Sequence, residues 1–243
     1  MTTPPAATPS DSASDLASYS QIAKLIDHAL LKPTLTDAEI EAGCLEARKY
    51  DVASVCISHY ALPRAVALLA GSSVQPTTTI GFPLGTVATA SKLAETELAL
   101  REGATELDMV VNIGKVRSGE YSYVENEIAA ILRLVRAAGR KLKVIFENAY
   151  LEREHKLRLC GLCSALEVDW IKTSTGFASS GATLEDLELM LDNTPPQVQV
   201  KASGGIRSLE QVLAMQALGV SRIGTSSTQS ILDALRARND EPR

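Results

Sequence analysis

The chain has few aromatic residues and no long apolar run. Phe, Trp and Tyr make up 4% of the 243 residues, so a folded core must be built mainly from Leu, Val, Ile and Ala. No apolar segment approaches the roughly 18 residues that a membrane-spanning helix requires. We therefore expect no membrane partner.

Basic clusters are absent as well. Lys and Arg number 24 against 29 Asp and Glu, which gives a net charge of -5, and the basic residues are dispersed along the chain. Because non-specific binding to nucleic acid depends on concentrated positive charge, we expect no nucleic-acid partner. An anionic small molecule would have to be captured by local groups, since the overall field does not favour it.

The cysteines and histidines are too few and too scattered to predict a metal site. Cys160 and Cys163 form one C-x-x-C pair inside an amphipathic run, with no second pair elsewhere, and we interpret both as buried packing residues. The three histidines lack the spacing of metal ligands. We expect no metal.

Strand-like and helix-like segments alternate eight times along the chain. The predicted strands are residues 26–30, 52–57, 77–80, 106–111, 143–146, 170–172, 198–201 and 222–224, and a short N-terminal helix over 15–25 precedes them. This alternation predicts a parallel sheet covered by helices, and eight units in roughly 220 residues fit an α/β fold of the (β/α)8 TIM-barrel type. The main alternative is an open doubly wound sheet, which usually has a phosphate fingerprint after its first strand, and none occurs here.

Local signals set the expected boundaries. Residues 1–18 are rich in Pro, Ser, Thr and Ala and lack the parts of a secretory signal, so we expect a disordered N-terminal arm and a cytoplasmic location. One barrel domain is expected over 19–237 and a frayed C-terminus over 238–243. Capping boxes predict helix starts at Thr36, Ser122 and Ser208, and the last helix is expected over 226–236.

Alternation along the strands predicts which side chains point into the barrel. Leu107 and Met109 are apolar and should face the helices, which sends Asp108 inward. The same argument sends inward Cys56, Lys172 and Lys201. Because active sites of this fold lie at the carboxyl ends of the strands, we expect these four side chains, with Asp27 at the rim, in one mouth.

Two inward lysines beside one acid indicate imine chemistry. Like charges and burial both lower the pKa of a lysine, and a neutral lysine attacks carbonyl groups to form a Schiff base. Asp108 could then transfer protons. The alternative is structural, with Asp108 closing the barrel as one half of an ion pair. For Cys56 we favour a place in the pocket wall over a role as nucleophile.

Loops of small residues follow the last three predicted strands. Phosphate sites in this fold are often built from loops after strands seven and eight and a helix N-terminus. The candidate phosphate residues are Thr175 and Gly176, then Gly204, Gly205 and Arg207, and finally Gly224, Ser226 and Ser227. The residues therefore predict a carbonyl substrate that bears a phosphate.

Seven motifs, taken in their order along the chain, resemble those of the deoxyribose-phosphate aldolase family. Members of this family are class I aldolases on a (β/α)8 barrel. The motifs cover nearly the whole chain from about residue 22 to 235: IDHALLKPT (26–34), GFPLG (81–85), ATELDMVVNIG (104–114), KVIFE (143–147), WIKTSTGF (170–177), KASGGIR (201–207) and RIGTSS (222–227). The resemblance implies cleavage of 2-deoxy-D-ribose 5-phosphate to D-glyceraldehyde 3-phosphate and acetaldehyde, in deoxyribonucleoside catabolism.

The resemblance also implies residue roles. Lys172 would form the Schiff base, Lys201 would hold its pKa down, and Asp108 would transfer protons. Asp27 and Cys56 would line the substrate channel, and the three small-residue loops would hold the phosphate. No metal or organic cofactor is implied, the partner is a phosphorylated sugar, and a homodimer is left open.

The chain departs from the family pattern at several positions. Ala178 and Ser180 stand where glycines are common, Asn148 stands where threonine is frequent, and no tyrosine follows Tyr150, whereas some members have a C-terminal tyrosine that aids proton transfer. Two alternatives stay open: a Schiff-base aldolase or transaldolase for another phosphorylated sugar, and a non-catalytic barrel that binds sugar phosphates.

Overall fold

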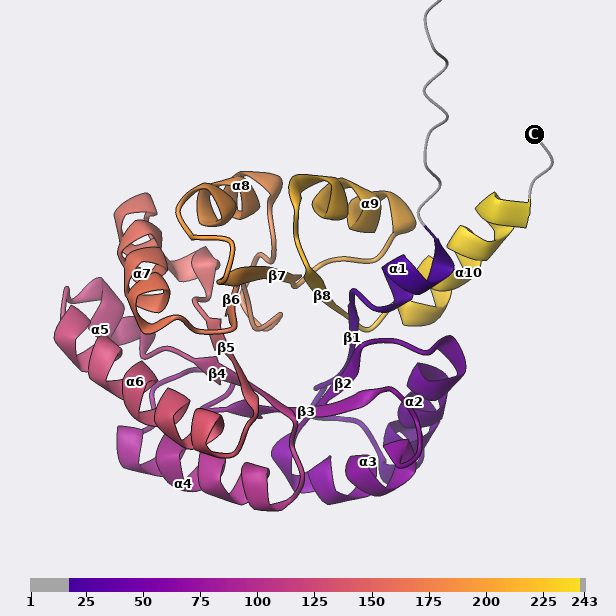
Figure 1. The fold of residues 1–243 in the computed structure, drawn as a ribbon, viewed down its shortest axis with the longest axis horizontal. Coiled ribbons are helices and arrows are strands. Elements are labelled where there is room, and N and C mark those ends of the chain that lie inside the picture. Colours follow the sequence, from indigo (N-terminus) through magenta and orange to yellow (C-terminus); the bar gives the residue numbers. More distant parts are fainter. Residues whose placement is uncertain (1–17, 241–243) are drawn as a thin grey trace, which may run out of the picture.

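Eight parallel strands form a closed barrel in the computed structural model, which describes residues 18–240 (Figure 1). The strands follow one another in sequence order around the barrel, and β1 pairs with β8 to close it. The strands are β1 (Ile26–Leu30), β2 (Ser54–Ile57), β3 (Gln75–Ile80), β4 (Glu106–Val110), β5 (Lys141–Ile145), β6 (Trp170–Lys172), β7 (Gln199–Ser203) and β8 (Arg222–Thr225). The predicted (β/α)8 fold is confirmed, and the open doubly wound sheet is excluded.

Helices surround the barrel and cover its outer face (Figure 1). They are α1 (Tyr19–Ala23), α2 (Asp37–Tyr50), α3 (Leu62–Leu69), α4 (Thr89–Arg101), α5 (Ile113–Arg117), α6 (Tyr121–Ala137), α7 (Arg153–Leu166), α8 (Leu184–Asp192), α9 (Leu209–Leu218) and α10 (Thr228–Asp240), with short 3-10 turns η1 (His59–Ala61) and η2 (Asn148–Tyr150). None of the helices within residues 18–240 has the length and apolarity needed to cross a bilayer.

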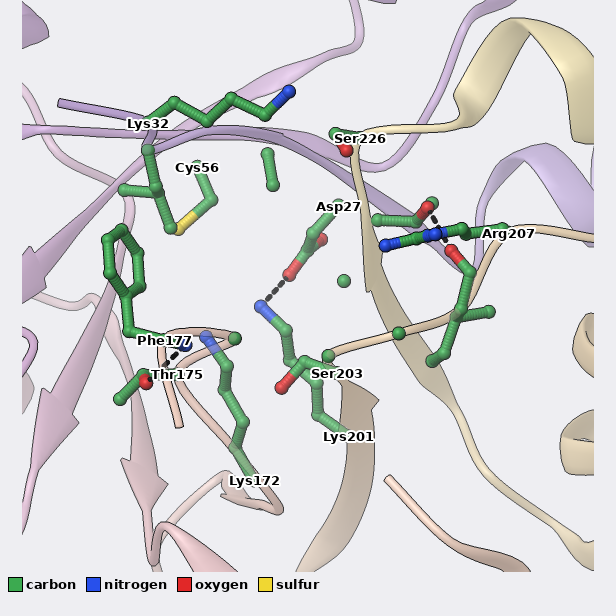
Figure 2. Close-up of a pocket in the computed structure, with 18 of the residues that line it drawn as sticks. Asp27, Lys32, Cys56, Lys172, Thr175, Phe177, Lys201, Ser203, Arg207 and Ser226 are labelled. Atoms are coloured by element: carbon green, nitrogen blue, oxygen red, sulfur yellow. Dashed lines mark hydrogen bonds and ion pairs between the residues drawn. The ribbon is translucent and has the colours of Figure 1, made fainter. Parts of the chain in front are cut away.

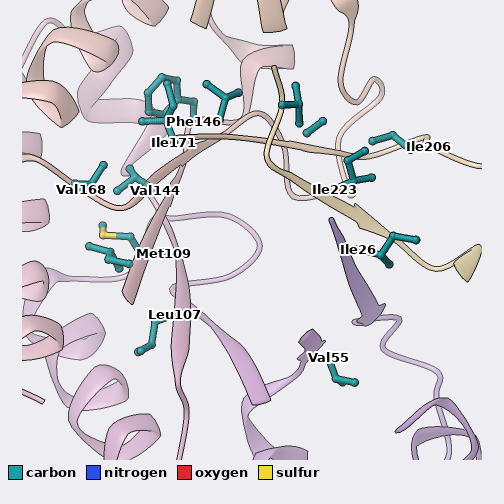
Figure 3. Packing of buried hydrophobic residues seen from close by; sticks show 14 of the residues in the cluster. Ile26, Val55, Leu107, Met109, Val144, Phe146, Val168, Ile171, Ile206 and Ile223 are labelled. Atoms are coloured by element: carbon teal, nitrogen blue, oxygen red, sulfur yellow. The ribbon is translucent and has the colours of Figure 1, made fainter. Parts of the chain in front are cut away.

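The apolar core lies between the sheet and the helices. Outward side chains of the strands, such as Val55, Leu107 and Ile171, are fully buried against the helices (Figure 3). Aliphatic side chains dominate this layer, as the low aromatic content requires. The predicted alternation is confirmed for the candidate site residues, because Asp108, Lys172 and Lys201 lie between outward apolar residues and contact one another inside the barrel.

Several predicted boundaries are wrong, because local patterns also occur away from helix ends. The Ser122–Glu125 spacing does not start a helix; α6 begins at Tyr121 after Glu120, which makes no side-chain cap. The N-terminal helix is shorter than predicted, since Ser18 caps it and it ends at Ala23. The last helix, α10, begins at Thr228 and continues to Asp240, past the predicted helix end at 236. The predicted arm, apart from Ser18, lies outside the described residues.

The other two capping boxes are confirmed. Thr36 accepts from the backbone N–H of Glu39 and begins α2, and Ser208 accepts from that of Gln211 and begins α9. Cys160 and Cys163 are both fully buried on α7, as packing residues should be. Defined helix starts such as those of α2 and α9 limit the length of the loops between the strands and the helices.

Candidate active site

A cavity of about 300 Å³ opens at the carboxyl ends of the strands. Lys172 and Lys201 rise into it from β6 and β7 and face Asp27 and Cys56 on the opposite side (Figure 2). Of the sequence-predicted residues, those that line it are Asp27, Cys56, Lys172, Thr175, Gly176, Lys201, Gly204, Gly205, Arg207, Gly224 and Ser226. Strand alternation and the loops at the carboxyl ends of the strands therefore bring the candidate residues together at one site.

Two predicted residues do not line this cavity. Asp108 is fully buried beneath it, where it contacts the lysines that do line it. Ser227 faces a separate shallow depression beside α10, and its backbone N–H donates to the hydroxyl of Thr225. The predicted place of Ser227 in the phosphate loop is therefore not supported by the cavity, because the chain has already turned toward α10 there.

Asp108 is the centre of a buried ionic network. Its Oδ2 accepts hydrogen bonds from Lys172 Nζ and Lys201 Nζ, each at 2.7 Å, and its Oδ1 accepts from Lys143 Nζ at 2.9 Å. Burial alone would raise the pKa of the Asp108 carboxyl, but the charges of these three lysines outweigh burial and hold that pKa well below its usual range. Asp108 is therefore an ionised carboxylate shared by three lysines.

Asp27 is the second acid of the network. It accepts from Lys201, from Arg222 Nη1 at 2.7 Å and from Ser54 Oγ at 2.6 Å. Burial would raise its pKa, yet the charges of Lys201, Lys143 and Arg222 prevail and lower it. Asp27 thus serves as a fixed counter-ion for Lys201, in addition to lining the cavity.

A further ion pair closes the network from below. Glu106 forms an ion pair with Lys143 and accepts two hydrogen bonds from the Arg222 guanidinium, at 2.9 and 3.2 Å. The carboxylates outweigh the effect of burial on both cations, so the pKa values of Lys143 and Arg222 are raised. Both side chains are therefore permanent positive charges in the barrel interior.

Lys172 differs from the other basic groups of this network. Burial has the largest effect on its pKa and lowers it, Asp108 raises it, and Lys201 lowers it again, so the net pKa lies below the usual value. Burial also lowers the pKa of Lys201, but Asp108 and Asp27 outweigh burial and raise it. Lys172 is thus the member of the network that loses its proton first.

Charge balance leads to the same conclusion. The network holds three carboxylates, Asp27, Glu106 and Asp108, and four basic groups, Lys143, Lys172, Lys201 and Arg222. A buried net charge is costly, and the network is neutral when one basic group is unprotonated. The pKa directions assign that role to Lys172. A neutral amine in a cavity is a nucleophile suited to a carbonyl substrate.

Cys56 lies beside this centre without sharing its reactivity. Its Sγ is 3.9 Å from Asp108 Oδ2, and burial, followed by the charge of Asp108, raises the pKa of the thiol to about 11. A protonated thiol is a poor nucleophile. The structure agrees with the expectation that Cys56 lines the pocket.

The rim of the cavity is built from backbone turns and two cations. Gly176, Gly204 and Gly205 have φ values of +90°, +87° and +78°, which side chains rarely adopt. Lys32, from the loop after β1, and Arg207, from the loop after β7, line the mouth (Figure 2). Exposed N–H groups and cations at a rim favour an anionic group such as phosphate.

One wall of the mouth is aromatic. Phe177, from the loop after β6, lines the cavity and meets Phe82, from the loop after β3, edge to face with ring centroids 5.3 Å apart. Phe82 belongs to the GFPLG turn and does not itself line the cavity. The turn therefore supports the wall through Phe177.

Among the residues of the site that sequence reasoning missed are four charged ones, in the network and at the rim. Lys143 lies opposite Asp108 in the β4–β5 register, and the alternation of Leu142, Lys143 and Val144 could have placed it inside the barrel. Glu106 and Arg222 lie at the first residues of their strands, where alternation is least certain. Lys32 is on a loop, for which strand alternation predicts nothing.

Comparison with known proteins places the chain in context. Residues 21–232 match the family model of the DeoC/LacD family aldolases. The chain is 52% identical to a deoxyribose-phosphate aldolase of Rhodopirellula baltica over 92% of this chain and 93% of that one. It is 49% identical to a deoxyribose-phosphate aldolase of Brevibacillus brevis, over 86% and 94% of the two chains.

A solved structure shows the same architecture. The deoxyribose phosphate aldolase of Aeropyrum pernix, described as a tetramer, superposes with a TM-score of 0.85 at 29% identity and covers 92% of this chain and 94% of its own. The likeness extends over the barrel and its helices and is not confined to a local motif.

Replacing Lys201 by leucine should move the reactivity of Lys172 to higher pH. The neutral amine reacts, so the rate of imine formation rises with pH through the pKa of Lys172. Loss of the Lys201 charge removes one group that lowers this pKa, and the midpoint should rise by about one pH unit or more. To measure this midpoint, the rate at which cyanoborohydride traps acetaldehyde on Lys172 is followed by mass spectrometry from pH 5 to 10.

The matched control is Lys49→Leu, which removes an exposed lysine of α2 far from the network. It should leave the midpoint of the wild type unchanged. An unshifted midpoint in Lys201→Leu would contradict the electrostatic account of Lys172.

Proposed function

The chain belongs to the DeoC/LacD family of aldolases, and from this premise we propose that it cleaves 2-deoxy-D-ribose 5-phosphate to D-glyceraldehyde 3-phosphate and acetaldehyde, reversibly, through a Schiff base on Lys172. The observation that carries the assignment of Lys172 is its place in the network: a buried lysine with a lowered pKa, bonded to Asp108, on the wall of a cavity with an anion-binding rim. The reaction belongs to deoxyribonucleoside catabolism.

The reaction begins with attack of Lys172 Nζ on the C1 aldehyde. The carbinolamine loses water to give an iminium ion, which withdraws electrons from the bond between C2 and C3. The C3 hydroxyl gives up its proton, this bond breaks, and D-glyceraldehyde 3-phosphate leaves. The remaining enamine is protonated at C2, and hydrolysis of the resulting iminium ion releases acetaldehyde and restores the free amine.

Asp108 and Lys201 are proposed to move the protons of these steps. Asp108 accepts a hydrogen bond from Lys201 and another from Lys172. In the free protein the lysines hold the pKa of Asp108 low, so it accepts a proton only as a partner gives one up. Lys201 stays charged because of Asp27 and Asp108, and it can stabilise an oxyanion that develops near C1 or C3.

The rim is proposed to bind the substrate phosphate. The glycines of the loops after β6, β7 and β8 allow close approach of backbone N–H groups, and Ser226, Arg207 and Lys32 add polar or charged side chains. The cavity separates this rim from Lys172, so a sugar bound by its phosphate can direct its aldehyde toward the amine.

Assembly and location stay predictions. The homodimer considered from the sequence and the tetramer described for the Aeropyrum pernix protein are both open for this chain. The proposed cytoplasmic location agrees with a role in nucleoside catabolism.

Replacement of Lys172 tests the nucleophile. Lys172→Arg keeps a cation that does not form imines, and Lys172→Ala removes the amine, so each should lower kcat for cleavage of 2-deoxyribose 5-phosphate by about 10⁴-fold or more without unfolding the protein. The assay follows D-glyceraldehyde 3-phosphate release, and circular dichroism checks the fold. Full activity in a folded variant would contradict the assignment.

The synthetic direction of the wild type identifies the substrate class. With D-glyceraldehyde 3-phosphate as acceptor, acetaldehyde should be the preferred donor over dihydroxyacetone and pyruvate. Preference for either of the latter would indicate an aldolase for another sugar. Thermal stabilisation by 2-deoxyribose 5-phosphate without turnover would indicate a non-catalytic binding protein.

Arg207→Ala should weaken phosphate binding. Arg207 is exposed at the rim, so loss of one charge-assisted contact should raise KM for 2-deoxyribose 5-phosphate about tenfold and change kcat little. Unphosphorylated 2-deoxyribose serves as the control substrate, for which kcat/KM should be unchanged. An equal loss for both substrates would exclude a role specific to phosphate.

A further inference from the structure

Glu147 is a buried acid that the reaction described above does not use. It lies two residues after the end of β5, is 2% exposed, and has φ +60° and ψ +64°. This left-handed conformation is unfavourable for a residue with a side chain, and burial of a carboxylate is costly as well. Two unfavourable features at one position, next to the cavity wall, point to a function beyond packing.

The carboxylate of Glu147 is held by the loop that follows Lys172. The backbone N–H of Thr175 lies 3.3 Å from each carboxylate oxygen, and the Thr175 hydroxyl donates to Oε2. The backbone next to Glu147 makes a second link, since the N–H of Asn148 donates to the carbonyl of Thr173 at 2.9 Å. Glu147 thus ties the end of β5 to the segment between Lys172 and the rim.

The hydrogen bonds of Thr175 fix the direction in which its hydroxyl points. A hydroxyl has one proton to donate and two lone pairs that accept. The proton goes to Glu147, and one lone pair accepts from the N–H of Phe177 at 3.0 Å. Thr175 lines the cavity, and no contact within the described residues takes the second lone pair of its hydroxyl, whose proton is already donated to Glu147.

We propose that Glu147 is a positioning residue that holds Thr175 as a hydrogen-bond acceptor for a substrate hydroxyl, and so selects aldehydes that have a hydroxyl group beside the carbonyl. The proposal rests on the aldolase function described above and names the part of the substrate that this wall recognises. Along the chain, Thr175 lies between Lys172, which binds C1, and Gly176 at the phosphate rim, and all three line the cavity. The C4 hydroxyl of 2-deoxyribose 5-phosphate lies between the same two ends.

Glu147→Gln tests this role with little change of shape. An amide has one accepting oxygen, which can take the Thr175 N–H, while its NH2 group donates to the Thr175 hydroxyl. The hydroxyl must then turn its proton toward the cavity, so its oxygen no longer accepts the proton of the substrate hydroxyl. The variant therefore reverses the polarity of the contact and leaves Lys172 in place.

The measurement compares two acceptors for acetaldehyde: D-glyceraldehyde 3-phosphate and 3-phosphooxypropanal, which lacks the hydroxyl beside the carbonyl. Glu147→Gln should lower kcat/KM for the first acceptor about tenfold to hundredfold and for the second about twofold or less. Glu154→Gln, an exposed glutamate on α7, is the matched control and should behave as the wild type with both.

A second variant keeps the proposal testable if Glu147→Gln does not fold. Thr175→Val removes the accepting oxygen and retains the branched shape, and it should lose the same preference between the acceptors. In the double variant the preference should equal that of Thr175→Val alone, because Glu147 acts through the hydroxyl that is absent there.

The outcomes separate this proposal from the proposed function. Equal losses with both acceptors, or no loss with either, would overturn the role of Glu147 while the aldolase assignment stands. If the wild type condenses neither acceptor with acetaldehyde, the proposed function itself fails. Cyanoborohydride trapping of acetaldehyde on Lys172 in each variant confirms that the nucleophile is intact.

Discussion

The site depends on one carboxylate that three lysines share. Asp108 lies fully buried inside the barrel and accepts from Lys143, Lys172 and Lys201. Without that negative charge, three ammonium groups would face one another in the buried interior of the barrel. With that charge in place, Lys143 and Lys201 stay protonated. Lys172 has the fewest carboxylate partners of the three and can lose its proton. The reactivity of Lys172 is therefore a property of the whole network and not of its own surroundings alone.

The fold accommodates this ionic network because its apolar and ionic layers are separate. The aliphatic side chains of the strands point outward and pack against the helices, which leaves the barrel interior to the charged side chains of the network, such as Glu106 and Arg222. Arg222 bridges Glu106 and Asp27, which links the closed end of the barrel to the cavity. A substitution of Glu106 or Arg222 would therefore alter the pKa of Lys172 through the charges of the network, although neither residue contacts Lys172 directly.

The sequence predicted those parts of the site that follow from strand alternation. Asp108, Lys172 and Lys201 were expected inside because apolar neighbours flank them, and the barrel places all three together. Lys143 obeys the same rule and could have been found. Glu147 could not, since its role depends on a left-handed turn and on a contact with a residue 28 positions away. The helix start predicted at Ser122 is wrong because the residue spacing of a capping box does not by itself determine where a helix begins.

Borohydride trapping with the substrate tests the central claim most directly. The wild-type protein is incubated with 2-deoxyribose 5-phosphate, reduced and digested, and the added mass is located by mass spectrometry. We expect the adduct on the peptide that contains Lys172, with Lys143 and Lys201 unmodified, because these two lysines stay protonated. A folded protein that gains no mass, or gains it on Lys201, would contradict the account of Lys172 as the neutral lysine of the network.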